Sequence, residues 1–188
     1  MKFYHDKKNA ESYAAICEGY NASEQLEMLY ERLPEGASVL ELGSGPGNDL
    51  ELLDSRFQVT GSDYSPAFIE MLEKRFPSVP LLPLDAVTIQ ASGSFDAIYS
   101  NKVLQHLDDE ELASSFSRQS KLLNPGGYVF HLIWCRIDSP PTDNGLLYIA
   151  RDIASMKTAM GSGFELIRVE EFGEFEDRDS LAILARKT

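Results

Sequence analysis

Apolar and polar positions change their spacing along the chain in a way that predicts strands and helices in alternation. Short, continuous apolar runs are typical of buried strands, and the segments between them carry apolar residues every three or four positions, as amphipathic helices do. The predicted strands are, in chain order, Val39–Leu42, Phe57–Asp63, Val79–Ala86, Phe95–Asn101 and Tyr128–Trp134. This alternation predicts a parallel sheet that carries helices on both faces.

The segments between these strands contain signals for helix ends. In the helix expected from Ser23, Leu26 and Leu29 share one face. Ser65 is predicted to cap another helix, with Pro66 at its first position. Further helices are expected over Asn48–Arg56, from near Asp108 to a stop at Asn124–Gly127, and around Leu146–Met160.

Beyond Trp134 the pattern changes. Two strand-like runs, Gly163–Phe172 and Ser180–Arg186, are separated by the acidic stretch GEFEDRD, which is too short for a crossover helix and suits an antiparallel hairpin. The prolines of the third strand predict an edge position for it. The sequence predicts a single domain over 1–188, with N-terminal helices in 1–33, a βα core in 37–134, and a lid helix and hairpin in 135–188.

The net negative charge of the chain disfavours binding to negatively charged partners. Asp and Glu number 30 against 17 Lys and Arg, a formal net charge of −13 that repels phosphate backbones and anionic lipids. Neither nucleic acid nor a membrane surface is therefore an expected partner. The N-terminus lacks the apolar core of a signal peptide and no run reaches membrane-spanning length, so a cytoplasmic location is expected by elimination.

The two cysteines, Cys17 and Cys135, lie far apart and have no C-x-x-C spacing or neighbouring histidine cluster. A disulfide scaffold is therefore not expected, and neither is a zinc or other metal site. Both cysteines are expected to act as small buried apolar residues.

The stretch VLELGSGPGNDL, Val39–Leu50, is the first candidate for ligand binding. It places Gly43, Gly45 and Gly47 between a predicted strand and a predicted helix, where glycines let a ligand approach the backbone. The dinucleotide fingerprint G-x-G-x-x-G requires glycine or alanine where this chain has Asn48, and no G-K-[ST] follows. Two interpretations remain, a ligand-binding turn and a turn that serves packing alone.

Polar residues stand at the ends of four successive predicted strands. Glu41 precedes the glycine turn, and the later ends carry Asp63, Asp85 and Asn101. In such a sheet, ligands bind outside the carboxyl ends of the strands. Asp63 can accept hydrogen bonds from both ribose hydroxyls, and Asp85 can accept one from an exocyclic amine such as that of adenine. Each alone is explained as a helix-terminus or loop acid, but together they favour an adenosine-containing ligand.

These motifs, taken in order, resemble those of the class I S-adenosylmethionine-dependent methyltransferases, in particular the small standalone members that act on small molecules. The resemblance is carried by VLELGSGPGNDL, VTGSDYSPAFIEML, LPLDA, FDAIYSNKVLQHL and LLNPGGYVF, and it covers roughly Tyr13–Trp134. It implies a Rossmann-like, doubly wound, seven-stranded α/β sheet, mostly parallel with an antiparallel C-terminal strand and with helices on both faces. It is specific for the cofactor and says little about the methyl acceptor.

The resemblance implies contacts to S-adenosylmethionine along the strand ends. Asp63 would bind the ribose hydroxyls, and Tyr64 would pack on the adenine ring. Asp85 and Ala86 would contact the adenine edge. The residues implied around the methionine part are Glu41, Gly43, Ser44, Gly45 and Gly47.

Two further regions are implied to contact the cofactor. Asn101 and Val103 would offer backbone carbonyls to its ammonium group. The aromatic N-terminal segment would cover it, with Tyr13 as the first choice and Tyr4 as the second. Ordinary helix packing is the alternative for each tyrosine.

Methyl transfer requires the acceptor to be aligned with the methyl carbon and the sulfur in a pocket without water. A general base is needed only where the acceptor must lose a proton, and His106, just past the fourth strand, is the candidate. A structural role in its turn is the alternative. His131 lies inside an apolar strand and is expected to be a core residue, and His5 is expected on the surface.

The residues that contact the methyl acceptor are less well defined by the sequence than those that contact the cofactor. Trp134 and Tyr148 fall where acceptor pockets form in members of the family, with Tyr4 as a third candidate for substrate contact, although packing is the expected role for Trp134. Only Cys135–Gly163 and the N-terminal helices remain to form a lid, which predicts a small acceptor. Oxygen, nitrogen, sulfur and carbon acceptors all fit these residues, and the acidic surface favours a neutral or cationic one.

The predicted function is S-adenosylmethionine-dependent methyl transfer to a small-molecule acceptor, with S-adenosylhomocysteine as the product. A protein methyltransferase is one alternative, and a non-catalytic cofactor-binding or regulatory module is another. A nicotinamide-dependent enzyme is disfavoured by Asn48 and by the antiparallel end of the sheet.

Overall fold

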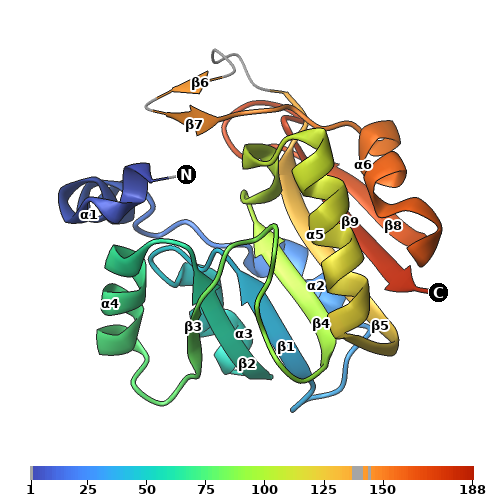
Figure 1. Ribbon diagram of the computed structural model, residues 1–188, viewed down its shortest axis with the longest axis horizontal. Helices are drawn as coiled ribbons and strands as arrows, with labels where there is room; N and C mark the ends of the chain where they lie inside the picture. Colours follow the sequence, from blue (N-terminus) through green and yellow to red (C-terminus); the bar gives the residue numbers. More distant parts are fainter. Residues whose placement is uncertain (1, 137–141, 144) are drawn as a thin grey trace.

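The structure is a computed structural model that describes residues 2–136, 142–143 and 145–188 (Figure 1). Its strands are β1 (Ser38–Leu42), β2 (Gln58–Asp63), β3 (Leu81–Pro83), β4 (Phe95–Asn101), β5 (Leu123–Trp134), β6 (Thr142–Asp143), β7 (Leu146–Leu147), β8 (Phe164–Phe172) and β9 (Ser180–Lys187). Its α-helices are α1 (Lys7–Ile16), α2 (Ser23–Tyr30), α3 (Asn48–Asp54), α4 (Pro66–Arg75), α5 (Asp109–Leu122) and α6 (Ile153–Met160). Short 3₁₀ helices are η1 (Phe3–His5), η2 (Leu104–His106) and η3 (Gly161–Gly163).

Seven of the described strands form one sheet in the order β3-β2-β1-β4-β5-β9-β8. The strands from β1 to β5 run parallel, and β9 lies antiparallel between β5 and β8 (Figure 1). The predicted doubly wound sheet with an antiparallel C-terminal strand is confirmed, as is the edge position of β3, where Pro83 has no N–H to donate.

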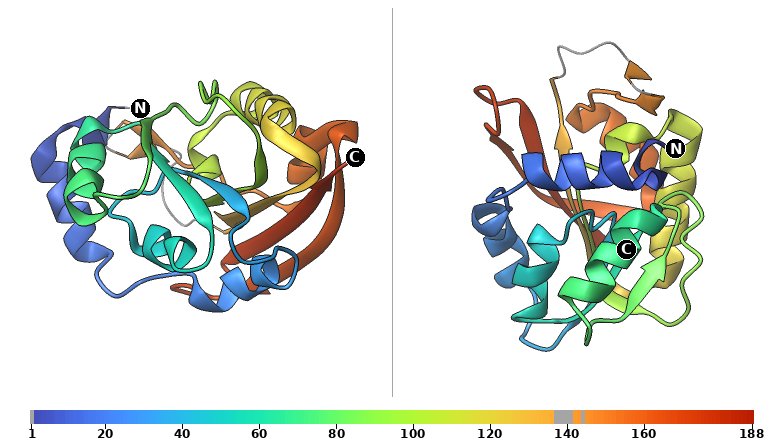
Figure 2. Two further views of the ribbon diagram at one scale, coloured as in Figure 1. Left: turned by 90° about the horizontal axis from the view of Figure 1, so that it is seen from below. Right: turned by 90° about the vertical axis from the view of Figure 1, so that its left-hand side faces the viewer.

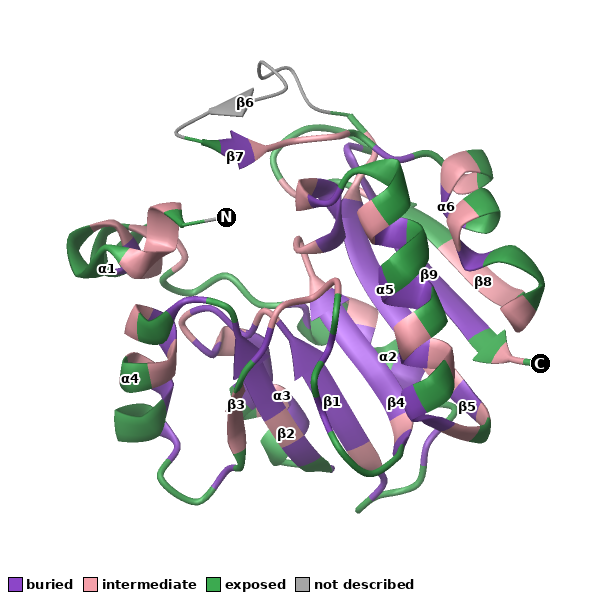
Figure 3. Ribbon diagram, in the orientation of Figure 1, coloured by how far each residue is buried: buried purple, intermediate pink, exposed green. Residues whose placement is uncertain are grey.

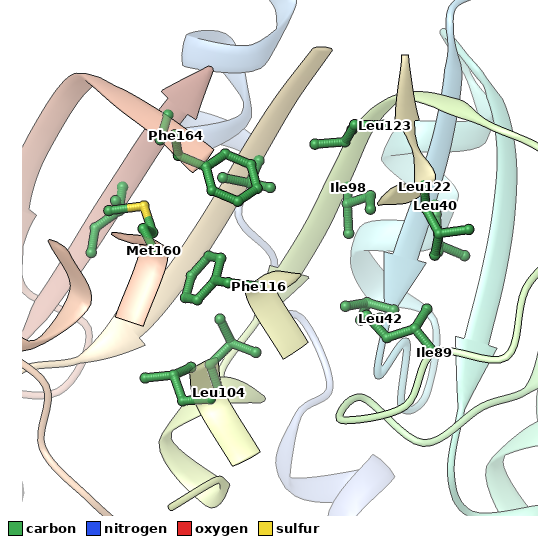
Figure 4. Packing of buried hydrophobic residues seen from close by; sticks show 14 of the residues in the cluster. Leu40, Leu42, Ile89, Ile98, Leu104, Phe116, Leu122, Leu123, Met160 and Phe164 are labelled. Carbon is green, nitrogen blue, oxygen red and sulfur yellow. The ribbon is translucent and has the colours of Figure 1, made fainter. Parts of the chain in front are cut away.

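Helices cover both faces of the sheet (Figure 2). Because side chains alternate along a strand, neighbours such as Val39 and Leu40 enter different cores. Helices α2, α3 and α4 pack on one face, and α5 and α6 pack on the other, where Phe116, Met160 and Ile98 belong to one buried cluster (Figure 4). Each large apolar side chain buried in this way contributes about 1.5–3 kcal/mol relative to an exposed one.

The central strands are buried on both faces, as Figure 3 shows for β1, β4 and β5. Within β5, His131 is fully buried. Its Nδ1 lies 2.8 Å from Ser100 Oγ and its Nε2 lies 2.9 Å from Gln119 Oε1. The expectation of a core histidine is confirmed, because both ring nitrogens have partners.

Two local expectations are wrong. The helix expected around Leu146–Met160 begins only at Ile153, because Asp152 caps it by accepting the Ser155 N–H at 2.8 Å, and Leu146–Leu147 instead form β7. The cysteines are not buried core residues, since Cys17 and Cys135 are both only partly buried. No helix within the described residues has the length and apolar character needed to span a bilayer.

Candidate active site

A cavity of about 770 Å³ lies at the carboxyl ends of β1, β2 and β4. Its walls come from the ends of these strands, from α1 and η1, from Gly145–Leu147 and from Phe172–Glu174. In Figure 1, α1 and β7 lie beyond the same edge of the sheet, although they are far apart in sequence. The strand ends and two separate segments therefore enclose one space, whose size suits a small-molecule ligand.

The glycine turn forms part of this wall, and its three glycines serve two purposes. A Cβ at Gly43 would collide with the Val103 side chain, and one at Gly47 would lie 2.5 Å from Phe76. A Cβ at Gly45 would meet nothing within 4 Å, and its φ of +51° suits glycine. Gly43 and Gly47 therefore serve packing, whereas Gly45 exposes backbone to the cavity.

Asp63 lies at the end of β2 beside this turn. Its Oδ2 accepts the Gly45 N–H at 2.9 Å, and its Oδ1 accepts the Ser65 N–H at 2.8 Å. Burial raises the pKa of Asp63 to about 6, and these backbone hydrogen bonds oppose the rise. The carboxylate is thus held in one orientation on the cavity wall, with lone pairs left on both oxygens.

Glu41 is the most deeply buried acid of the cavity lining, with 2% of its surface exposed. Its Oε2 accepts the Ser44 hydroxyl at 2.5 Å. Burial and the neighbouring Asp49 raise the pKa of Glu41 to about 8, so it carries a proton at neutral pH. A cationic ligand beside Glu41 would lower this pKa and favour the ionised carboxylate.

Asp49 is a cavity residue that the sequence did not single out. Its Oδ1 accepts the Ala22 N–H at 2.8 Å, and its Oδ2 accepts the Tyr99 hydroxyl and the Asn101 amide, each at 2.8 Å. Asn101 Oδ1 is buried without a hydrogen-bond partner among the described residues. Such an orphaned acceptor beside an acid is suited to an N–H donor from a ligand.

The remaining strand-end residues also line the cavity. Asp85 Oδ1 accepts the Val87 N–H at 2.7 Å, which fixes the loop after β3. Ala86 lies beside it, and its carbonyl accepts the Ser115 hydroxyl at 2.6 Å. Tyr64 is 42% exposed and offers a ring face at the cavity rim.

An aromatic group from the N-terminal segment closes another side. The ring centres of Tyr4 and Tyr13 are 4.9 Å apart, and both rings contact Phe68 of α4. Burial and Tyr148 raise the pKa of Tyr4 above its usual value. His5 was expected on the surface, but it is half-buried and lines the cavity, because its ring packs against Tyr64 at 5.0 Å.

His106 lies in η2, directly after β4, and lines the cavity. Its Nδ1 lies 2.6 Å from the Leu147 carbonyl oxygen, so Nδ1 carries the proton and Nε2 keeps its lone pair. Burial lowers the pKa of His106 below 6.5. Its ring contacts Tyr148 edge-on at 4.8 Å.

The cavity wall formed by Lys102 and Phe172–Glu174, called the far wall below, holds a partly buried ion pair that the sequence did not predict. Lys102 Nζ lies 2.9 Å from Glu174 Oε2, and both residues line the cavity. The Trp134 indole N–H donates to the same oxygen at 2.9 Å, and the Trp134 ring stacks on Tyr148. Lys102 adopts a φ of +54°, which is uncommon for a residue with a side chain and is frequent near functional sites.

Sequence signals for these additional residues are weak. Asp49 is indistinguishable from an ordinary acid in the first turn of a helix, and Glu174 stands in an acidic connection. Only Lys102, a cation at the end of an apolar strand inside the SNKVLQHL motif, has a position that draws attention.

The strand order and the cavity at the strand ends define the class I S-adenosylmethionine-dependent methyltransferase fold. Residues 39–127 match the family described as "Methyltransferase domain". The resemblance inferred from the motifs is confirmed over this segment, which makes up just under half of the chain.

The chain also resembles individual proteins. It is 41% identical over 92 residues to a trans-aconitate 2-methyltransferase of Methylobacterium radiotolerans, a match covering 47% of this chain and 35% of that protein. The corresponding Escherichia coli enzyme is 38% identical over 93 residues, covering 47% of this chain and 36% of the enzyme. The chain thus spans little more than a third of these curated relatives.

Solved structures share the fold at low identity. An S-adenosylmethionine-dependent methyltransferase from Clostridium acetobutylicum superposes with a TM-score of 0.77 at 14% identity, covering 96% of this chain and 98% of that one. The N-methyltransferase NodS from Bradyrhizobium japonicum, in complex with S-adenosylhomocysteine, gives 0.73 at 20% identity, covering 88% and 84%.

Proposed function

We propose that this protein is an S-adenosylmethionine-dependent methyltransferase that acts on a small-molecule acceptor. The observation that carries the proposal is the fixed carboxylate of Asp63, which the Gly45 and Ser65 N–H groups hold on the cavity wall. The matched methyltransferase domain and the relatives that bear this activity support it. In this proposal 1–33 cover the cofactor, 37–134 form its binding core and 135–188 supply the lid and the hairpin.

The cavity residues fit S-adenosylmethionine on three counts. The open space before Gly45 admits an amino-acid tail, and the orphaned Asn101 Oδ1 is an acceptor for its ammonium group. Asp63 has the free lone pairs that two ribose hydroxyls require. The other residues proposed to hold the cofactor are Tyr13, Glu41, Gly43, Ser44, Tyr64, Asp85, Ala86 and Val103. Gly47 is proposed to contribute indirectly, by letting the turn pack against Phe76.

The bound cofactor supplies a methyl group on a sulfonium: as the acceptor's lone pair bonds to that carbon, the carbon–sulfur bond breaks and its electron pair stays on sulfur. The protein's part is to align the acceptor and exclude water, which in favourable systems lowers the barrier by about 7–11 kcal/mol. His106 Nε2 is proposed to take a proton from an acceptor that must lose one. Tyr4 is proposed to form the acceptor wall. Tyr148 and Trp134 are not among the described residues that line the cavity, and they are proposed to shape this wall through their contacts with His106 and Glu174.

The names of these relatives indicate different acceptors. The curated ones act on trans-aconitate, a carboxylic acid, whereas NodS is an N-methyltransferase. Trans-aconitate is a small molecule, which agrees with a cavity closed by short segments. The expectations that neither nucleic acid nor a membrane is a partner, and that the protein is cytoplasmic, stay predictions.

Calorimetric titration tests the proposal directly. The protein is titrated in turn with S-adenosylmethionine, S-adenosylhomocysteine and NAD, and the two sulfur compounds are expected to bind while NAD does not. Preference for NAD, or no binding of either sulfur compound, would overturn it. Transfer of labelled methyl groups to a metabolite extract then separates an enzyme from a non-catalytic binding module.

A further inference from the structure

The far wall of the cavity presents a carboxylate whose position is fixed by its surroundings. Lys102 and Trp134 both contact Oε2 of Glu174, so neither contact uses the other oxygen, Oε1. The turn that carries Glu174 is held by Asp179, which accepts the Glu174 N–H at 2.9 Å and the Phe175 N–H at 3.0 Å. Glu174 is therefore a preorganised acceptor of hydrogen bonds on the cavity wall.

The charge of the cavity disfavours an anionic acceptor. Among the described lining residues, eight are acidic, one is lysine and none is arginine. Four of the acids, Glu41, Asp49, Asp63 and Asp85, belong to the region proposed for the cofactor, which leaves acids in excess on the acceptor side as well. The ionised acids outnumber the one lysine even with Glu41 protonated, so a carboxylate entering this space would meet net repulsion.

The single lining lysine cannot serve as a carboxylate receptor without losing its own partners. Lys102 Nζ contacts Glu174 and donates to Ser180 Oγ at 2.6 Å. It also lies 5.0 Å from the ring centre of Phe172 and 5.5 Å from that of Trp134. Its side chain is only 8% exposed, so its charge is already compensated within the wall.

The same surroundings suit an ammonium group. Aromatic faces and a carboxylate together stabilise organic cations, and this wall already holds one in that way. His106 joins the wall through its contact with Tyr148, whose ring stacks on Trp134, the donor to Glu174. Glu174, the Phe172 ring and the His106 imidazole thus line the same cavity, whereas Trp134 and Tyr148 are not among its described lining residues and contact Glu174 and His106 from behind it.

We propose that the methyl acceptor is a small amine, bound through its N–H groups by Glu174. This inference rests on the proposed function. An amine that arrives as an ammonium ion gives one proton to Nε2 of His106, and its nitrogen recovers the lone pair that forms the new bond. Glu174 is then the residue that selects amines over carboxylates.

The test compares charge classes on the protein loaded with S-adenosylhomocysteine. The probes are benzylamine, cyclohexylamine and glucosamine, matched against benzoate, cyclohexanecarboxylate and gluconate, with trans-aconitate added because relatives act on it. Binding is followed by NMR titration of this loaded protein. Methyl transfer is followed in separate reactions with methyl-labelled S-adenosylmethionine, by label that is stable to base in an N-methyl product and released by base from a methyl ester. Amines are expected to bind and to take base-stable label.

Two variants assign the effect to Glu174. Glu174→Gln is expected to weaken amine binding about tenfold or more without changing affinity for S-adenosylhomocysteine. Glu176→Gln, which removes the same charge from an exposed position of the same turn, should leave both unchanged. Glu174→Asp keeps the charge and is expected to retain part of the amine affinity, and thermal melting checks that each variant is folded.

Three results would overturn the inference while the proposed function stands: base-labile label on the carboxylates, no preference between the two charge classes, or equal amine binding by Glu174→Gln and the parent. If the first titration shows binding of neither S-adenosylmethionine nor S-adenosylhomocysteine, the proposed function itself is overturned. The amine proposal, which depends on it, is then overturned as well.

Discussion

The side-chain amide of Asn48 donates a hydrogen bond to the backbone carbonyl oxygen of Cys17 at 2.7 Å. The same amide donates to the Tyr20 carbonyl at 2.9 Å. Asn48 occupies the position at which a dinucleotide fingerprint carries glycine or alanine. In this chain that position connects the glycine turn to the N-terminal segment that closes the cavity.

Replacing Asn48 should loosen the N-terminal segment and leave the sheet intact. Asn48→Gly completes the G-x-G-x-x-G spacing but removes two hydrogen bonds worth about 0.5–1.5 kcal/mol each. We expect faster proteolysis within residues 2–22, weaker binding of S-adenosylhomocysteine, and no gain of affinity for NAD. Limited proteolysis and calorimetry measure these effects.

A second variant at this position separates the lost donor from the poor helix propensity of glycine. Asn48→Asp has the same shape and keeps an acceptor toward Arg75, but it cannot donate to Cys17 or Tyr20. The same increase in proteolysis is expected. Tight NAD binding by Asn48→Gly, or unchanged proteolysis in both variants, would contradict the role given to Asn48.

Asp63→Ala should weaken binding of S-adenosylhomocysteine by about 1–3 kcal/mol, because it removes a charged acceptor that the Gly45 and Ser65 N–H groups hold in place. Calorimetry gives the difference in free energy of binding. Asp54→Ala, at an exposed position at the end of α3, is the matched control and should bind like the parent. Unchanged affinity in Asp63→Ala would exclude the ribose contact.

Stability of the ligand-free protein should fall as pH rises from about 7 to 8. The pKa of Glu41 is about 8 in the folded protein against 4.5 as the ordinary value, so the folded state binds more protons in this window. The free energy of unfolding then decreases by up to about 1.4 kcal/mol per pH unit. His131 has a pKa of about 3 in the folded protein, so its titration affects stability only below pH 6.5. There it makes the free energy of unfolding rise as pH rises, opposite to the effect of Glu41.

Urea denaturation at pH 7.0 and 8.0 measures this slope. The glutamine in Glu41→Gln cannot titrate, so the free energy of unfolding of this variant should be nearly the same at pH 7.0 and 8.0. Glu176→Gln should show the same dependence on pH as the parent. A slope that persists in Glu41→Gln would show that another group is responsible.

The sheet was predictable because its signals are local. The alternation that sends Val39 and Leu40 to opposite cores is visible in four residues, and Ser65 followed by Pro66 marks a helix start without reference to the rest of the chain. The β7 strand was missed because it depends on pairing with β6 and on a cap at Asp152, which apolar periodicity does not record.

Some residues of the candidate site could likewise be predicted from the sequence, and others could not. Asp63, Asp85 and Asn101 could be found because strand ends converge at one edge of a parallel sheet. Lys102 and Glu174 could not, since β9 and β8 bring residues 72 positions apart into contact only after the hairpin has joined the sheet. Their pairing depends on tertiary structure, and neither residue type is unusual in its own segment.

His106 should act through Nε2, and two substitutions distinguish this from a structural role. His106→Asn can still donate to the Leu147 carbonyl but has no group at the Nε2 position, whereas His106→Gln places a non-basic amide there and loses the Leu147 contact. For an acceptor that must lose a proton, both are expected to lower kcat by about 10²–10⁴-fold. Affinity for S-adenosylhomocysteine should be unchanged in both.

The pH profile supplies an independent check on His106. Because burial lowers the pKa of His106 below 6.5, Nε2 is unprotonated at neutral pH, and kcat/KM should fall only as pH drops below that value. Both variants should lose this acidic limb. If His106→Asn kept the parent rate and only His106→Gln were impaired, the Leu147 hydrogen bond, not proton transfer, would be the function of the imidazole.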